Sequence, residues 1–118
     1  MGKKLFIFFV FFTNTSLYSQ IEYAQSQIKG QIVSRKGFTV SYNETHEQAN
    51  WVAYELTASE LNGSAKRTNN FSKDPRIKTG SALSSDYTNS GYDRGHLAPA
   101  ADMTWSQSAM RESFYMTN

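Results

Sequence analysis

The alternation of apolar and polar residues predicts a pair of β-strands in the middle of the chain. Residues 38–42 (Phe-Thr-Val-Ser-Tyr) alternate with β-forming side chains, and residues 51–57 are dense in aromatic and branched ones. Both patterns are typical of strands. The polar residues 43–50 between them are few enough for a hairpin-like link, so we expect the two strands to pair antiparallel. His46 lies in that link, where we interpret it as a solvated loop histidine.

The pattern further along the chain predicts two more strands around one short helix. A strand is expected from Tyr92 onward, and another over residues 114–118, which are mostly aromatic and apolar. Between them, Ser106 is a favourable N-cap for a helix over about residues 107–113. We therefore expect an α+β fold with an antiparallel sheet and short helices.

Residues 58–90 contain mainly turn-forming side chains, and we expect little regular structure there. This stretch carries the basic cluster of the sequence, in which five cations stand against one carboxylate: Lys66, Arg67, Lys73, Arg76 and Lys78 against Asp74. Phe71, in its middle, could stack or anchor the loop. The spacing of these charges alone favours a solvated loop, which we call the basic loop (residues 66–78). A loop of this length in a compact domain is often functional, so a phosphate site nearby would give the cluster more weight.

The N-terminus has the pattern of a secretory signal peptide. Two early lysines are followed by eight consecutive apolar residues and then by small polar ones. This order is typical of export signals, and the apolar run is far shorter than the roughly 20 residues that span a bilayer. We predict a signal peptide over residues 1–19, a linker or N-terminal arm over residues 20–37, and a folded domain over residues 38–118. The protein is expected to be secreted or periplasmic, without stable membrane association.

Charge and cysteine content narrow the possible partners. The chain has 12 basic and 10 acidic residues, a formal net charge of +2. Lys3 and Lys4 lie in the predicted signal peptide, so the mature chain would be formally neutral. A general attraction to nucleic acid is then excluded, and any such binding must rest on local clusters. There is no cysteine, so an exported domain would be held together by its core without disulfides.

Candidate chemistry concentrates in the tetrapeptide Asp93-Arg94-Gly95-His96. An imidazole can take a proton from water near neutral pH, and a guanidinium fits phosphate bidentately. On a strand, Arg94 and His96 would point to one face and could address one substrate. This suits phosphodiester hydrolysis, because the cation would stabilise charge developing on the phosphate. Gly95 would permit close packing behind the site, and Asp93, on the opposite face, would pair with a basic group beneath it.

Other interpretations of these residues stay open. A histidine beside an arginine and an aspartate is more often a structural residue. Asp102 would share the strand face of His96, but two ligands at that separation are a weak metal signature. Ser106 and Ser108 have no paired base in the sequence, so a serine-hydrolase triad has no support beyond residue type.

The residues around His96 resemble a known family. Residues 93–97 (Asp-Arg-Gly-His-Leu), followed by Ala101, are similar to the signature of the DNA/RNA non-specific endonucleases, the secreted bacterial nuclease and endonuclease G type. The resemblance extends over about residues 38–118, in the order and spacing of the family. Residues 51–54 resemble the early core strand of the family. Residues 66–71 with 74–75 resemble its basic loop, and residues 105–107 with 114–118 resemble its downstream stretch.

The resemblance implies a ββα-metal (His-Me finger) nuclease fold and a secreted endonuclease that hydrolyses phosphodiester bonds of DNA and RNA without marked sequence specificity. It implies that His96 is the general base, that Arg94 contacts the substrate or the transition state, and that Arg67 binds phosphate as well. Three further residues would support the active site: Asp93, Gly95 and Asn118. Contacts would go mainly to the phosphate backbone of the nucleic acid.

The sequence departs from the family pattern at the metal. The family uses Mg²⁺, with other divalent cations possible, held by one asparagine within an Asn-Gln-x-x-Trp stretch; such sparse ligation suits magnesium. This sequence contains no such stretch. We therefore expect the metal ligand beyond residue 118 and a domain that is C-terminally incomplete. The alternative is a catalytically inactive, nucleic-acid-binding fragment without the metal ligand, and a third possibility is a secreted carbohydrate or protein binder.

Overall fold

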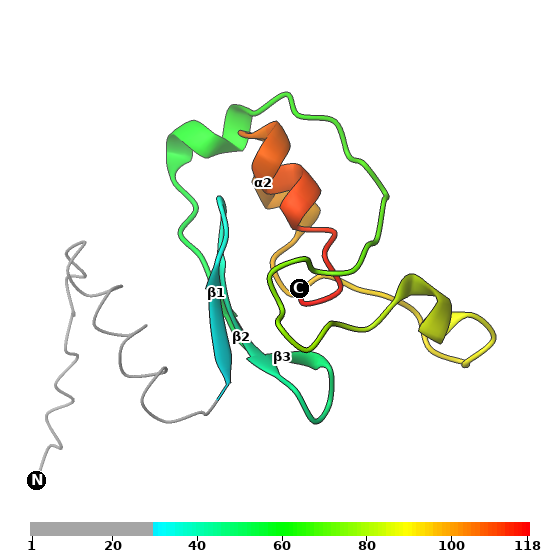
Figure 1. The fold of residues 1–118 in the computed structure, drawn as a ribbon. Coiled ribbons are helices and arrows are strands. Elements are labelled where there is room, and N and C mark those ends of the chain that lie inside the picture. Colours follow the sequence, from blue (N-terminus) through cyan, green and yellow to red (C-terminus); the bar gives the residue numbers. More distant parts are fainter. Residues whose placement is uncertain (1–29) are drawn as a thin grey trace, which may run out of the picture.

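The centre of the computed structural model, which describes residues 30–118, is a three-stranded antiparallel sheet (Figure 1). Its strands follow one another in space as they do in sequence: β1 (Gln31–Ser34), β2 (Thr39–Asn43) and β3 (Gln48–Ala53). Val40 of β2 lies opposite Val33 on one side and Val52 on the other. The middle strand is also the most buried one, with Val40, Ser41 and Tyr42 fully buried.

The predicted antiparallel hairpin is confirmed, although β3 begins and ends earlier than expected. The Asn43 side chain accepts hydrogen bonds from the backbone N–H groups of Thr45 and His46, at 2.9 and 3.1 Å. This closes the turn quickly, so the ladder already resumes at Gln48. The predicted residues 55–57 are exposed and lead into a helical turn instead. His46 is exposed at the hairpin tip, as expected for a loop histidine.

The interpretation of residues 20–37 as a linker is wrong for residues 31–34, which form β1 and pair with β2. Val33 is only 4% exposed and belongs to the core. Gln31 binds the neighbouring loop, because its amide donates to the Arg76 carbonyl at 2.7 Å. Four residues with one buried apolar side chain leave too weak a pattern to predict a strand. The predicted signal peptide and the rest of the arm, through residue 29, lie outside the described residues.

The helical elements are short. Residues 58–90 have little regular structure, as predicted, with one 3-10 turn near each end; the elements are η1 (Ala58–Asn62), η2 (Ser84–Tyr87), η3 (Ala100–Met103) and α2 (Gln107–Glu112). The predicted helix and its N-cap are confirmed, since Ser106 Oγ accepts from the Ala109 N–H at 3.4 Å. Within residues 30–118, no helix has the length and apolar character needed to cross a bilayer.

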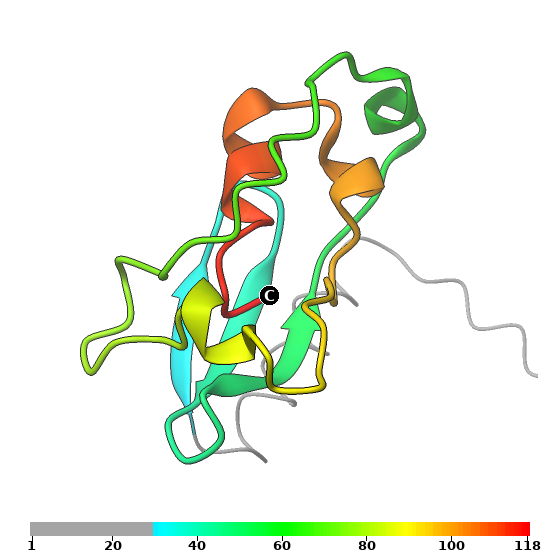
Figure 2. The ribbon, with the colours of Figure 1, turned by 90° about the vertical axis from the view of Figure 1, so that its right-hand side faces the viewer.

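The core lies between the sheet and the segment that contains η3 and α2. Figures 1 and 2 show α2 beside one end of the sheet, where the Lys36 N–H of the β1–β2 turn donates to Glu112 at 2.7 Å. Tyr42 and Phe114 are the largest fully buried side chains. The other core residues are Val33, Phe38, Val40, Ile77, Ala98, Ala100, Met103, Ala109 and Met110.

Two predicted strands are not present among the described residues. The backbone from Tyr92 to His96 has no regular secondary structure, and residues 114–118 form turns with a single bridge to Ser72. Gly91, with a φ of 83°, turns the chain immediately before Tyr92. The Asn118 N–H donates back to the Tyr115 carbonyl at 3.0 Å, so the last residues curl instead of extending. Local turns therefore override the apolar pattern in both segments.

Candidate functional site

Segments that are far apart in sequence meet at His96. The Ser72 N–H donates to the Phe114 carbonyl at 3.1 Å, and the Met116 N–H donates to the Ser72 carbonyl at 2.9 Å. These two bonds lay the basic loop along the C-terminal residues, as the ribbon shows in Figure 2. The loop thereby brings Phe71 to the imidazole of His96, with ring centroids 5.2 Å apart.

Asn118 fastens the chain just beyond the histidine. Its Oδ1 accepts from the Ala98 N–H at 2.8 Å, and its Nδ2 donates to the Ala98 carbonyl at 3.0 Å. Nδ2 also donates to the Ser113 carbonyl at 2.8 Å. Both polar atoms of the side chain are therefore engaged with backbone. Asn118, which the sequence predicts to support the site, thus binds the backbone two residues after His96.

A buried carboxylate, Asp74, lies beneath this arrangement. It forms an ion pair with Arg35, whose side chain is only 3% exposed. It also accepts from Thr117 Oγ1 at 2.6 Å and from the Arg76 N–H at 2.9 Å. Arg35 stacks over the Tyr115 ring, with Cζ 4.7 Å from the centroid. Asp74 thus joins the β1–β2 turn, the basic loop and the C-terminal residues, a role that sequence reasoning missed.

The imidazole of His96 lies among aromatic rings. It contacts Phe71 and also Phe114, whose centroid is 4.6 Å away at an interplanar angle of 89°. Its Nε2 is buried and has no hydrogen-bond partner within residues 30–118. Burial lowers the pKa of His96, and the positive charge of Arg67 lowers it further. The neutral imidazole, which is the form able to take up a proton, is therefore favoured.

The two predicted arginines flank these rings from different segments. Cζ of Arg94 lies 5.0 Å from the Phe71 centroid, and Cζ of Arg67 lies 5.0 Å from the Phe114 centroid. Arg94 also donates to Ser84 Oγ. Nε of Arg67 donates at 2.6 Å to Oδ1 of Asn69, a residue in the left-handed region with a φ of 52°. Both guanidinium groups belong to exposed residues that can meet an anion.

The basic cluster divides into two kinds of residue. Arg67 lies at the site, whereas Arg76 donates to the Ser34 carbonyl and fastens the loop to β1. The cluster therefore serves the fold as well as the site. The three lysines of the loop are exposed: Lys66, Lys73 and Lys78.

Three expectations about the tetrapeptide are wrong. Arg94 and His96 do not share a strand face; they meet because both contact Phe71. Gly95 is exposed, and a Cβ there would contact nothing within 4 Å, so it permits no packing behind the site. Asp93 lines the same cavity as His96 instead of the opposite face, and its carboxylate accepts from the Arg94 N–H at 2.8 Å. The acid that pairs with a buried cation is Asp74.

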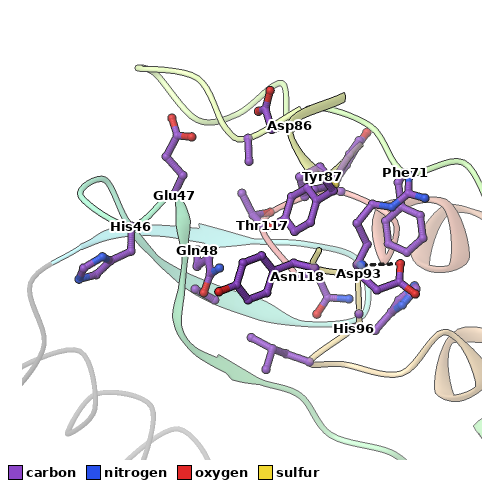
Figure 3. A pocket seen from close by; sticks show the side chains of 18 of the residues that line it. His46, Glu47, Gln48, Phe71, Asp86, Tyr87, Asp93, His96, Thr117 and Asn118 are labelled. Carbon is purple, nitrogen blue, oxygen red and sulfur yellow. Dashed lines mark hydrogen bonds between the residues drawn. The ribbon is translucent and has the colours of Figure 1, made fainter. Parts of the chain in front are cut away.

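A cavity of about 750 Å³ opens beside these groups. Figure 3 shows Phe71, Asp93 and His96 gathered toward one end of it, while His46 and Glu47 lie at the other end, on the β2–β3 turn. The dashed line in that view is the hydrogen bond that Asp93 accepts from its neighbour. The cavity gives a substrate room to lie against the imidazole.

Acidic, histidine and cysteine side chains do not gather into a metal-binding cluster within the described residues. Residues 30–118 contain no group of three or more His, Cys, Asp or Glu side chains that could hold one. The conceivable ligand Asp102 accepts a hydrogen bond from the Tyr54 hydroxyl at 2.7 Å, and this bond raises the pKa of Tyr54. Asp102 is therefore structural in this arrangement.

The two serines of the helix N-terminus have no base beside them among the described residues. Ser106 and Ser108 share a hydrogen bond of 2.9 Å with each other, which gives no support to a hydrolase triad.

Comparisons with known proteins agree on one family. The family model described as DNA/RNA non-specific endonuclease matches residues 18–118. The chain is 40% identical over 89 residues to a nuclease of Nostoc sp., an alignment covering 74% of this chain and 32% of the relative. It is 38% identical over 90 residues to human mitochondrial endonuclease G, covering 75% of this chain and 30% of that protein.

A solved structure shows the same fold. A chain in the crystal structure of the EndoG/EndoGI complex, which concerns the mechanism of EndoG inhibition, superposes with a TM-score of 0.72 at 29% identity. The superposition covers 91% of this chain and 45% of that one. The chain spans about a third of the length of the curated relatives named above. The α+β fold with an antiparallel sheet and short helices, of the ββα-metal nuclease type, is thus confirmed, and the chain belongs to the DNA/RNA non-specific endonuclease family.

Proposed function

We propose that this chain supplies the histidine and the arginines of an endonuclease active site, which hydrolyses phosphodiester bonds of DNA and RNA without marked sequence specificity. The observation that carries the proposal is the environment of His96. Its imidazole has a lowered pKa and a buried, unpaired Nε2 within the described part of the chain. It stands beside a cavity and between two arginines on neighbouring rings. Family membership supports the same reaction.

The chemistry follows from these groups. Neutral His96 takes a proton from a water molecule as the water oxygen attacks phosphorus. Charge gathers on the non-bridging phosphate oxygens as the new bond forms. The bond from phosphorus to the leaving oxygen then breaks, and the leaving oxygen keeps the electron pair and takes a proton from solvent water. Arg94 and Arg67, permanently charged and able to bind phosphate with two N–H groups, stabilise the charge on the non-bridging oxygens. Because phosphates carry no sequence information, such contacts accept many sequences. Tolerance of RNA follows when the 2′-hydroxyl is not read.

A divalent cation belongs to this proposal as a cofactor, and we propose Mg²⁺. Members of this family depend on a divalent metal. When bound, such an ion supplies further positive charge at the phosphate and the leaving oxygen. Residues 30–118 offer no ligand cluster for it. We therefore assign no step of the reaction to a metal bound by these residues, and propose that its ligand lies outside them.

His96→Ala in the full-length protein tests the base. We expect the initial rate of plasmid and RNA cleavage with Mg²⁺ to fall by about 10² to 10⁴-fold, the usual contribution of general-base catalysis. Val52→Ala is the matched control, because Val52 packs against the core without lining the cavity, and we expect it to keep most of the rate. Full activity of His96→Ala, with circular dichroism like that of the wild type, would exclude this role.

The alternative function is nucleic-acid binding without cleavage, favoured by the lack of a metal-ligand cluster in residues 30–118. Fluorescence anisotropy with a labelled oligonucleotide separates the two. Binding that weakens steeply with salt, because phosphate contacts release counterions, together with no Mg²⁺-dependent cleavage, supports the binder. Cleavage that requires His96 supports the enzyme.

We also propose that the protein is exported. The basic and apolar start of the chain supports a signal peptide over residues 1–19. Expression in a bacterial host with its own leader should give a product outside the cytoplasm whose N-terminus, by mass spectrometry, is Gln20. Lys3→Glu/Lys4→Glu should slow export by removing the basic start, whereas Lys36→Glu should not. Retention of an uncleaved product in the cytoplasm would contradict the proposal.

A further inference from the structure

We propose that Phe71 is a positioning residue of the active site: its ring holds the imidazole of His96 and the guanidinium of Arg94 side by side, so that base and cation address one phosphate. The inference rests on the proposed function and adds a residue to it. Phe71 comes from the basic loop, whereas the two groups that it contacts come from the tetrapeptide.

Three rings form one cluster around the base. Phe71 and Phe114 are 5.1 Å apart at 71°, and His96 lies 5.2 Å from the first and 4.6 Å from the second. All three pairs have the edge-to-face geometry that aromatic rings prefer. Phe114 is fully buried and belongs to the core. Phe71 is half-buried and lines the cavity, so it is the ring that faces a substrate.

The cations complete the arrangement. Arg94 lies over Phe71 and Arg67 over Phe114, each at 5.0 Å, within the distance at which a guanidinium is attracted to a ring face. The side chains therefore follow one another in contact: Arg94, Phe71, His96, Phe114 and Arg67. Removing the Phe71 ring would remove the contact that connects His96 to Arg94.

The backbone holds Phe71 independently of its ring. The bridge between Ser72 and Tyr115 is made by main-chain groups, so it survives a change of the Phe71 side chain. A substitution at Phe71 should therefore alter the surroundings of His96 more than the path of the loop. This separates a positioning role from a purely structural one.

The charged groups around His96 decide the expected pH effect. They are Arg67 from the basic loop and Asp93 and Arg94 from its own segment, with Asp86 of η2 further along the cavity. Residues 114–118 bring no charged side chain. Loss of the ring admits water to the imidazole while these charges remain. The protonated form is then better solvated, and the pKa of His96 moves up toward the ordinary value of about 6.5.

Histidine proton resonances in NMR give a readout that does not depend on activity. Residues 1–118 contain two histidines, and the resonance that is lost in His96→Gln identifies His96. We expect His96 to titrate below about 6.5 in the wild type and in Phe71→Tyr, and to move upward in Phe71→Ala. An unchanged His96 titration in folded Phe71→Ala would overturn the proposal.

Kinetics of the full-length protein complete the test. Phe71→Ala should lower kcat by about 10- to 100-fold, as a misplaced reactive group does, with little change in KM and an acidic limb moved to higher pH. Phe71→Tyr should restore kcat. Should Phe71→Ala fail to fold, Phe71→Leu keeps the apolar volume, lacks the ring and should give the same loss.

Val52→Ala is the control for stability alone, because Val52 packs against the core and does not line the cavity. An equal loss of kcat in Val52→Ala, at equal loss of stability, would overturn the positioning role. A wild type that cleaves nothing would instead refute the proposed function, and the NMR titration would still decide whether Phe71 governs the imidazole.

Discussion

At the scale of single residues, the protonation of His96 links the site to stability. Its pKa is lowered in the folded chain by burial and by Arg67. Between that lowered value and about 6.5, the unfolded chain binds more protons than the folded one, so stability rises with pH. Above about 6.5 both states hold a neutral imidazole, and this contribution no longer changes.

Urea unfolding at a series of pH values checks this sign. The free energy of unfolding should fall as the pH drops from about 6.5 toward the lowered pKa of His96. His96→Gln should show a shallower fall over the same window, since the titrating group is gone. Val52→Ala, which removes no titrating group, should keep the wild-type slope. Equal slopes for all three proteins would contradict the lowered pKa.

The motif residues themselves could be found from the sequence, but their arrangement could not. Arg94 and His96 were expected to meet through strand alternation, and they meet through Phe71 instead. Contacts between the basic loop and the C-terminal residues depend on main-chain bonds of the Ser72–Tyr115 bridge. Pairing between two irregular segments leaves no periodic pattern of apolar and polar residues, so the sequence does not predict it. The three-ring cluster was missed for that reason.

At the scale of elements, the hairpin and the helix were predictable because each has a local signal. Residues 38–42 alternate in β-formers, and Ser106 caps the helix with its own hydroxyl. The two segments predicted as strands beside the site have apolar side chains but no neighbouring strand among residues 30–118 to pair with. β1 was missed for a different reason, since its four residues, two polar and two apolar, are too few to show an alternation.

The elements are joined beneath the site by Asp74, and its removal should be costly. Asp74→Ala leaves Arg35 buried without its partner and Thr117 without an acceptor. Breaking a buried ion pair from one side typically costs about 3–5 kcal/mol. We expect that loss in the free energy of unfolding, measured with urea. Glu55→Ala, at an exposed acid, should cost little.

A double-mutant cycle sharpens this test. Because Arg35 and Asp74 contact each other, Arg35→Ala with Asp74→Ala should cost clearly less than the sum of the single changes. Additive effects would show that the pair is not coupled. The stacking of Arg35 on Tyr115 is lost both in the double variant and in the single Arg35 variant, so this loss cancels in the coupling energy.

At the scale of the whole molecule, the proposed function carries a requirement for a divalent ion. EDTA should abolish plasmid cleavage by the full-length protein, and excess Mg²⁺ should restore it, because the ion stabilises charge at the phosphate. Binding of a labelled oligonucleotide should persist in EDTA, since Arg67 and Arg94 are not metal-dependent. Undiminished cleavage after exhaustive chelation would contradict the metal requirement.

The hydrogen bonds between Asn118 and Ala98 affect how much the length of the chain between these two residues can vary. The Asn118 amide binds both backbone groups of Ala98, and this closes a loop 20 residues long that contains η3 and α2. Loop-closure entropy grows only slowly with length, so added residues in an exposed part of this loop cost little once its ends are joined. His96 lies just outside the closure. An insertion of a few residues in an exposed turn of this loop should therefore leave the histidine in its place.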